Sequence, residues 1–167
     1  MNRALTCAIV GLTSLTSARL AFAQTPPAFT TQGAFFALSV ADLDASTKWY
    51  QDKLGMSVVM HPPKQDGAAV TVLEGGGLIV ELLQRDDAVP LRQAAPGVDA
   101  NYRVHGFFKA GVIVDDFDKT LATLKARAVE IAIGPFPATA TQRANVIVRD
   151  NVGNLIQFFG PSVNRAR

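Results

Sequence analysis

An internal repeat limits the folds open to this chain more than any other feature. The stretch FFALSVADLDAS, residues 35–46, recurs as KAGVIVDDFDKT, residues 109–120. Val40 then corresponds to Val114, and Asp42 to Asp116, at an offset of 74 residues. In both copies a short apolar run rich in β-forming residues meets an acidic cluster, where a helical pattern begins. The repeat predicts two modules of the same kind in tandem.

Each acidic cluster is expected to begin a helix. Asp42 or Asp44 in the first copy, and Asp116 or Asp118 in the second, can accept hydrogen bonds from the free amides of a first turn, a role we favour over catalysis. Residues at the i, i+4, i+7 and i+11 positions then form one helical face. These are Leu43, Thr47, Tyr50 and Leu54 in the first helix and Phe117, Leu121, Leu124 and Ala128 in the second. Trp49 and Tyr50 are accordingly interpreted as core aromatics.

Three strand candidates follow each helix, separated by Gly, Pro, Asn or Asp turns. They span residues 56–60, 68–73 and 78–83 in the first half and 129–133, 144–148 and 155–159 in the second. EGGG and DNVGN are the matching turns before the last strand of each half. The predicted organisation is a first βαβββ module, a connection, a second βαβββ module and a C-terminal tail, at residues 33–84, 85–104, 105–160 and 161–167.

The first 23 residues have the features of a secretory signal peptide. A basic start leads into a mostly apolar stretch that ends in the small-x-small triplet Ala21, Phe22 and Ala23. Arg19 interrupts the apolar stretch and leaves it too short for a membrane span. Residues 1–23 are therefore predicted to be removed, which leaves residues 24–32 as an extended leader and directs the protein to the periplasm or outside the cell.

Cleavage would change the chemistry of the chain. The only cysteine, Cys7, lies in the predicted signal, so the mature chain would have no thiol nucleophile or thiolate ligand. Loss of Arg3 and Arg19 would lower the basic residues from 16 to 14, equal to the 14 acidic ones. This balance gives no electrostatic case for a nucleic-acid partner, and no membrane partner is expected after cleavage.

These motifs resemble those of the vicinal oxygen chelate superfamily, which includes glyoxalase I, bleomycin resistance proteins and extradiol dioxygenases. The resemblance rests on VADLDAS...WYQDKLGM and RDNVGNLIQFF, and covers roughly residues 33–160. It implies an α+β fold in which two tandem βαβββ modules form a cupped, mixed eight-stranded sheet with the helices outside. In many members the cup holds a divalent metal, bound by His or Glu, sometimes Gln, from the first and last strand of each module.

Carried onto this chain, the four ligand positions of the family are Phe35, Glu81, Lys109 and Gln157. A phenyl ring and a protonated lysine have no lone pair to donate, and one carboxylate with one amide is a poor site for a divalent ion. Glu81 and Lys109 could instead neutralise each other in the cup. We therefore expect no metal and no other cofactor.

The first hypothesis is an exported protein that binds a small organic molecule in this cup. Period-2 alternation predicts the residues of its wall. They are Phe35, Ala37, Ser39, Ile79, Glu81, Leu83, Lys109, Gly111, Ile113, Leu155, Gln157 and Phe159. An aromatic ring, an ammonium group and two oxygen-bearing groups suit a flat or anionic ligand. No catalytic residue is identified, and the modules can pair within one chain or across a homodimer.

The second hypothesis is a metal-dependent lyase, isomerase or dioxygenase whose ligands have moved. Its donors would come from Glu81, Gln157, His61 and His105. Neither histidine has the short spacing of a metal motif, and surface or hydrogen-bonded roles are favoured for both. Whether the chain is an enzyme is left open by the sequence.

Overall fold

The computed structural model describes residues 28, 33–100 and 103–162. The residues from 33 onward belong to one compact unit. The predicted signal peptide, and the leader except for residue 28, lie outside the described residues. Among the helices of the described part, none is long and apolar enough to span a membrane.

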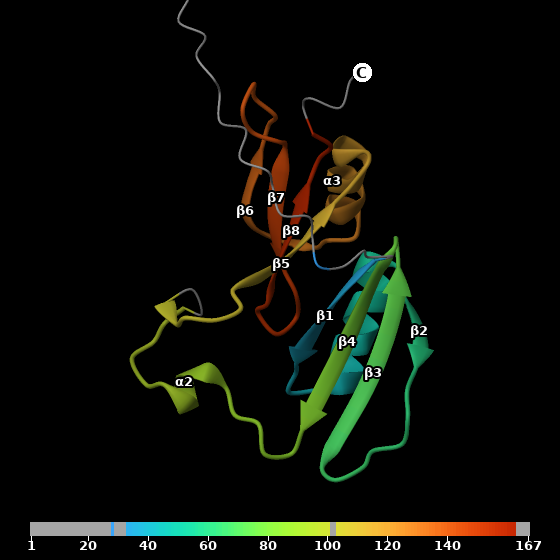
Figure 1. The fold of residues 1–167 in the computed structure, drawn as a ribbon, viewed down its shortest axis with the longest axis vertical. Coiled ribbons are helices and arrows are strands. Elements are labelled where there is room, and N and C mark those ends of the chain that lie inside the picture. Colours follow the sequence, from blue (N-terminus) through green and yellow to red (C-terminus); the bar gives the residue numbers. More distant parts are fainter. Residues whose placement is uncertain (1–27, 29–32, 101–102, 163–167) are drawn as a thin grey trace, which may run out of the picture. The chain divides into compact units, whose positions relative to one another are not determined.

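The first module contains four strands and one long helical segment (Figure 1). Its sheet has the order β1-β4-β3-β2, with β1 parallel to β4 and the other pairs antiparallel. The elements are β1 (Ala34–Ser39), α1 (Leu43–Trp49), η1 (Tyr50–Leu54), β2 (Ser57–Met60), β3 (Ala68–Gly75) and β4 (Leu78–Arg85).

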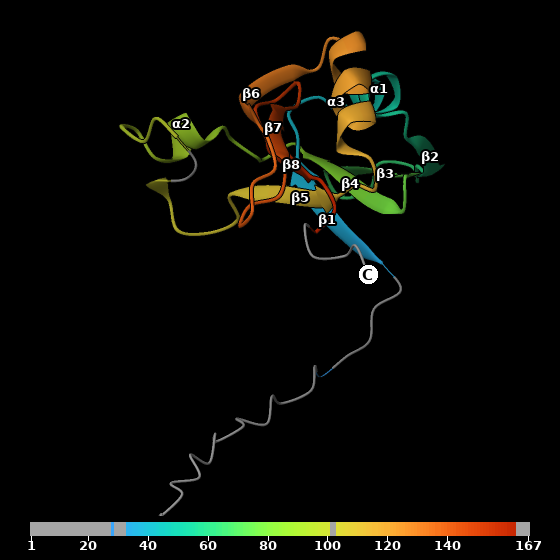
Figure 2. The same ribbon diagram turned by 90° about the horizontal axis from the view of Figure 1, so that it is seen from above.

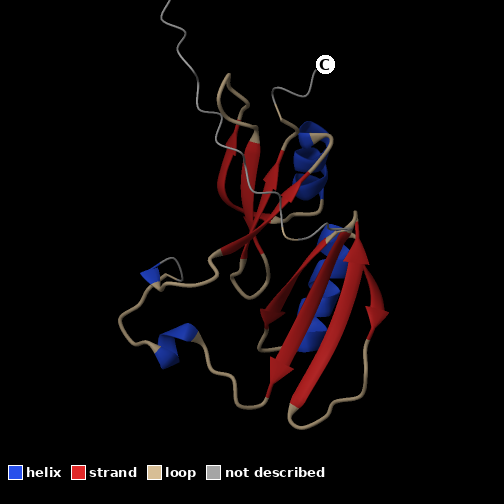
Figure 3. Ribbon diagram, in the orientation of Figure 1, coloured by secondary structure: helices blue, strands red, loops and turns tan. Residues whose placement is uncertain are grey.

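The second module repeats this topology (Figure 3). Its sheet has the order β5-β8-β7-β6, again with one parallel pair, between β5 and β8. The elements are β5 (Lys109–Ile113), α3 (Phe117–Ala126), β6 (Glu130–Phe136), β7 (Asn145–Arg149) and β8 (Leu155–Phe159). The predicted α+β class is confirmed, and its eight strands form two four-stranded sheets.

The two long helices begin where the acidic clusters predicted. Asp42 Oδ1 accepts a hydrogen bond from the Ala45 amide at 2.9 Å, and Asp116 Oδ1 accepts one from the Lys119 amide at 2.9 Å. Each aspartate has an extended backbone and satisfies an amide that has no partner inside the helix. The capping interpretation of these clusters is therefore confirmed, with Asp42 and Asp116 as the capping residues.

A single hydrophobic core joins the helix-bearing sides of both sheets. Leu38 and Val80 contribute from the first sheet, and Ile156 and Phe158 from the second. Tyr50, predicted as a core aromatic, is fully buried, and Trp49 packs against the core. Because alternate residues of a strand point to opposite faces, the other face of each sheet points away from this core.

Hydrogen bonds also join the modules at the core. The Tyr50 hydroxyl donates to Asp150 Oδ2 at 3.2 Å, and Asn151 Nδ2 donates to Ser46 Oγ at 3.1 Å. Burial, together with the nearby Asp150 carboxylate, raises the pKa of Tyr50 well above its usual value. Tyr50 thus stays protonated and provides a hydrogen-bond donor between the two repeats.

Three features differ from the sequence-based expectations or add to them. The first helical segment continues as the π-helix η1, and it fully buries Ser46, whereas Thr47 is half-buried. Ser46 and Thr47 follow the buried Leu43 by three and four residues within α1, so both lie near the face of Leu43, and the i+4 spacing alone selected Thr47. The connection contains a short helix, α2 (Leu91–Ala94), which belongs to neither sheet (Figures 1 and 2).

Candidate ligand-binding face

The twelve residues predicted to line the cup lie on the sheet faces opposite the helices. We call this surface the cup face of each module. In the first module Phe35, Ala37 and Ser39 of β1 pair in register with Ile79, Glu81 and Leu83 of β4. In the second module Lys109, Gly111 and Ile113 of β5 pair in register with Leu155, Gln157 and Phe159 of β8. Each set of six is therefore contiguous.

The cup face of the first module is open. Phe35 is 67% exposed and Ile79 is 41% exposed, while Glu81 is half-buried. Val72 of β3 pairs directly with Glu81, and Val70, which pairs with Leu83, lies diagonally from it. Valine offers the carboxylate no hydrogen bond, so Glu81 can interact with a molecule that approaches this face.

The cup face of the second module is more closed at its centre. Gln157 is 7% exposed, and its Nε2 donates to Asn145 Oδ1 at 3.0 Å. Asn145 Nδ2 in turn donates to the backbone oxygen of Arg143 at 3.1 Å. Ile113, at the edge of this face, is 65% exposed. The amide at position 157 thus belongs to a small hydrogen-bond network.

Asn145 was missed in the sequence. An asparagine at the start of an apolar run is as typical of a turn as of a strand. The register that pairs Asn145 with Phe159 was needed to place it beside Gln157. The available signal was the coincidence of two amides in neighbouring predicted strands of the same module.

Glu81 and Lys109 do not form an ion pair within the described chain. None of the ion pairs found there includes either residue. The Lys109 ammonium lies 5.6 Å from the centre of the Phe108 ring, a cation–π arrangement. The expected neutralisation of one charge by the other is therefore not seen in a single chain.

The four family positions do not fit a divalent metal. Phe35 and Lys109 supply no lone pair, so the Glu81 carboxylate and the Gln157 amide oxygen are the only donors among the four positions. The described residues include no group of three or more His, Cys, Asp or Glu side chains that could hold a metal ion. His61 Nδ1 lies 2.7 Å from the Thr71 hydroxyl, and His105 is exposed in the segment before β5.

A large cavity adjoins one end of the cup faces. It has a volume of about 1150 Å³ and includes Ser39 and Leu155 of the predicted wall. The rest of its lining comes mainly from the connection and includes Arg85 and Arg92. Asp86 also lines it. The cavity is thus bordered by several charged side chains.

Comparisons with known proteins agree with this architecture. The family model of the Glyoxalase/Bleomycin resistance protein/Dioxygenase superfamily matches residues 33–158. The chain is a two-module α+β protein and belongs to this superfamily. A search of curated protein sequences found no match.

Solved structures show the same fold at low sequence identity. A glyoxylase/bleomycin resistance protein/dioxygenase domain from Frankia sp. EAN1pec is 17% identical, with a TM-score of 0.63, over 82% of this chain and 96% of that chain. TnmS3, an antibiotic binding protein from Streptomyces sp. CB03234, is 18% identical, with a TM-score of 0.57, over 80% of this chain and 98% of that chain. A glyoxalase family protein from Enterococcus faecalis is 17% identical, with a TM-score of 0.58, over 78% and 96%.

Proposed function

We propose that the chain is an exported protein that binds a small organic molecule on the cup faces without a metal. The observation that carries the proposal is the chemistry of the four family positions. A phenyl ring, an ammonium group, a carboxylate and a bonded amide can bind an aromatic or anionic molecule, whereas they supply too few donors for a divalent ion. The similarity in fold to TnmS3, an antibiotic binding protein, supports a binding role.

The ligand would contact the open parts of both faces. Phe35 offers its ring for stacking and Lys109 offers a charge that is not neutralised by a carboxylate in the described chain. The neighbouring Ile79 and Ile113 add apolar surface. A planar aromatic carboxylate matches this combination of groups.

We also propose that two copies pair so that the cup face of one module meets that of the other module in the partner. The helix-bearing sides are already used by the shared core, and each cup face leaves large apolar side chains exposed. Light scattering should then show a dimer that Ile113→Glu weakens. A monomer at the same concentration for both proteins contradicts the pairing.

The binding proposal can be tested with 2-naphthoate, whose intrinsic fluorescence reports its environment. Saturable binding is expected in metal-free buffer, and it should weaken at least fivefold with Phe35→Ala or Lys109→Met. Phe107→Ala is the matched control, because Phe107 is 68% exposed and precedes β5, outside the twelve cup residues. Binding that requires added zinc or nickel, or that is insensitive to both cup variants, would favour the metal-dependent alternative or no site on this face.

Export is tested separately by mass spectrometry of the protein recovered from the periplasm or the medium. We expect a mature chain that begins at Gln24. Retention of residues 1–23 in the recovered protein would contradict the proposed signal peptide.

A further inference from the structure

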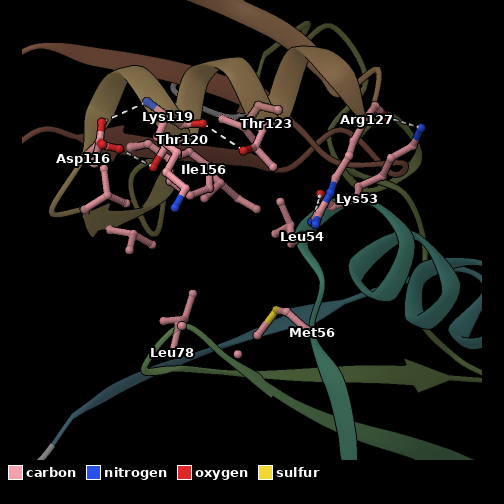
Figure 4. Close-up of a pocket in the computed structure, with 16 residues that line it drawn as sticks. Lys53, Leu54, Met56, Leu78, Asp116, Lys119, Thr120, Thr123, Arg127 and Ile156 are labelled. Carbon is pink, nitrogen blue, oxygen red and sulfur yellow. Dashed lines mark hydrogen bonds between the residues drawn. The ribbon is translucent and has the colours of Figure 1, made fainter.

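A second cavity lies on the helix-bearing side of the fold, away from the cup faces. Its volume is about 310 Å³, and none of the twelve predicted cup residues lines it. Helix α3 forms one wall, while Met56 and Leu78 of the first module lie across from it (Figure 4). Lys53 and Arg127 meet at one end of the cavity (Figure 4). The cavity thus lies at the junction of the two modules.

The inner lining of the cavity is apolar. Met56, Leu124 and Ile156 line it, and all three are buried residues of the hydrophobic core. Val112 and Leu78, which pack against this core, extend the same apolar lining. An apolar group that entered here would contact core side chains directly and would be removed from water.

The rim of the cavity is cationic. Lys53, Lys119 and Arg127 line it, and Asp116 is the one acidic residue among its lining. Asp116 Oδ1 already accepts the Lys119 amide as the helix cap. None of the ion pairs found in the described part of the chain includes Lys53, Lys119 or Arg127. Positive charge at this rim is therefore left without a carboxylate partner.

Two of these cations are held in place by a reciprocal contact between the repeats. Lys53 Nζ donates to the backbone oxygen of Arg127 at 2.6 Å, and Arg127 Nη1 donates to the backbone oxygen of Lys53 at 3.2 Å. Gly55 makes room for the guanidinium, since a Cβ there would lie 3.0 Å from Arg127 Nη1. Both cations keep further N–H groups for an anion.

We propose that this cavity binds a small amphipathic monoanion, with its charged head at the lysine and arginine rim and its apolar body against the core. At about 30 Å³ for each water-sized group, the volume accommodates an apolar body of roughly ten heavy atoms. A medium-chain carboxylate has this size and charge. The site is independent of the cup faces, because the two share no residue.

Octanoate is the probe, and the measurements are calorimetric titration and methyl NMR spectra of the full chain. We expect saturable binding of octanoate with shifts at the Met56, Leu78 and Val112 methyl groups. Two fewer methylene groups in hexanoate should weaken binding by about tenfold or more. Octanol should bind more weakly than octanoate, since it lacks the charge.

Variants of α3 provide the matched comparison. Lys119→Met should weaken octanoate binding by about threefold to fivefold, as expected for one exposed charge, and Thr123→Trp should abolish it by filling the mouth of the cavity. Lys125→Met is the control, because Lys125 is an exposed lysine of the same helix that does not line the cavity.

Three results would overturn the proposal: equal effects of Lys119→Met and Lys125→Met, octanol binding as tight as octanoate, or octanoate shifts confined to Ile79 and Ile113 of the cup faces. Phe35→Ala should leave octanoate binding unchanged, and Lys119→Met should leave 2-naphthoate binding unchanged. Failure of the cup proposal and failure of this one are thereby separated.

Discussion

The two modules carry different polar side chains at one equivalent position of the cup face. Glu81 and Gln157 occupy equivalent places in β4 and β8, each in register with the first strand of its module. Gln157 is buried and bonded to Asn145, whereas Glu81 is half-buried and pairs with Val72 of β3. The amide of the second module is thus buried and has a polar partner, and the carboxylate of the first module is neither fully buried nor bonded to its strand neighbour. At the centre of the second cup face the polar group is therefore bonded within the protein, whereas the carboxylate of the first cup face remains available to a ligand.

The turns that precede β4 and β8 also differ between the modules. A change in the second of these turns should have the largest effect on the free energy of unfolding. Asp150, which is 4% exposed, accepts hydrogen bonds from the Tyr50 hydroxyl, the Val152 amide and both nitrogens of Asn154. Asp150→Ala should lower the free energy of unfolding by about 3 to 4 kcal/mol, because the buried Tyr50 hydroxyl and three part-buried N–H groups lose their acceptor. Chemical denaturation measures this change.

Glu74 is the control from the first module, where the turn is formed by Gly76 and Gly77 at φ 60° and 78°. Glu74 is exposed, so Glu74→Ala should change the free energy of unfolding by no more than about 0.5 kcal/mol. Similar losses for the two variants would show that the turns do not differ in the way described.

Exchange of a carboxylate and an amide at these two equivalent positions should change the stability by unequal amounts. Gln157→Glu should destabilise the fold by about 2 to 3 kcal/mol at neutral pH, because a buried carboxylate would face the Asn145 oxygen. The loss should shrink at acidic pH as the introduced group takes up a proton. Glu81→Gln should stay within about 0.5 kcal/mol. Equal effects in denaturation curves at pH 5 and 7 would contradict the asymmetry of the cup faces.

The junction between the modules gives a pH dependence of intermediate size. Tyr50 has a raised pKa in the folded chain, so its contribution to stability is fully present below its unfolded pKa of about 10 and is lost as the pH rises above it. The free energy of unfolding should fall above pH 10 by about 1.4 kcal/mol per pH unit more in the wild type than in Tyr50→Phe. Parallel curves for the two proteins would exclude this role.

The parts of the fold that local patterns control were predictable. Helix starts at Asp42 and Asp116 follow from residue type and position alone, and alternation placed the cup residues on one face of each sheet. Contacts that depend on the pairing of distant segments were not predictable, such as Gln157 with Asn145 and Lys53 with Arg127. The cavity beside α3 belongs to this second group, since its lining comes from both modules.

The smallest expected effect concerns one helical position that differs between the repeats. Thr47 of α1 corresponds to Leu121 of α3 at the offset of 74 residues, and Leu121 packs against the core. The Thr47 hydroxyl is buried without a hydrogen-bond partner among the described residues. A buried polar group without a partner destabilises the folded state, so the first module is less well packed here than the second.

Thr47→Val should therefore raise the free energy of unfolding by about 1 kcal/mol, because valine keeps the branched shape and removes the unsatisfied hydroxyl. Thr123→Val is the matched control, since the Thr123 hydroxyl donates to the Lys119 backbone oxygen at 2.8 Å on the exposed side of α3. Its effect should remain within about 0.5 kcal/mol. Urea denaturation of both variants decides between the outcomes: a loss of stability in Thr47→Val would mean that its hydroxyl has a partner in solution, and the difference between the two helices would disappear.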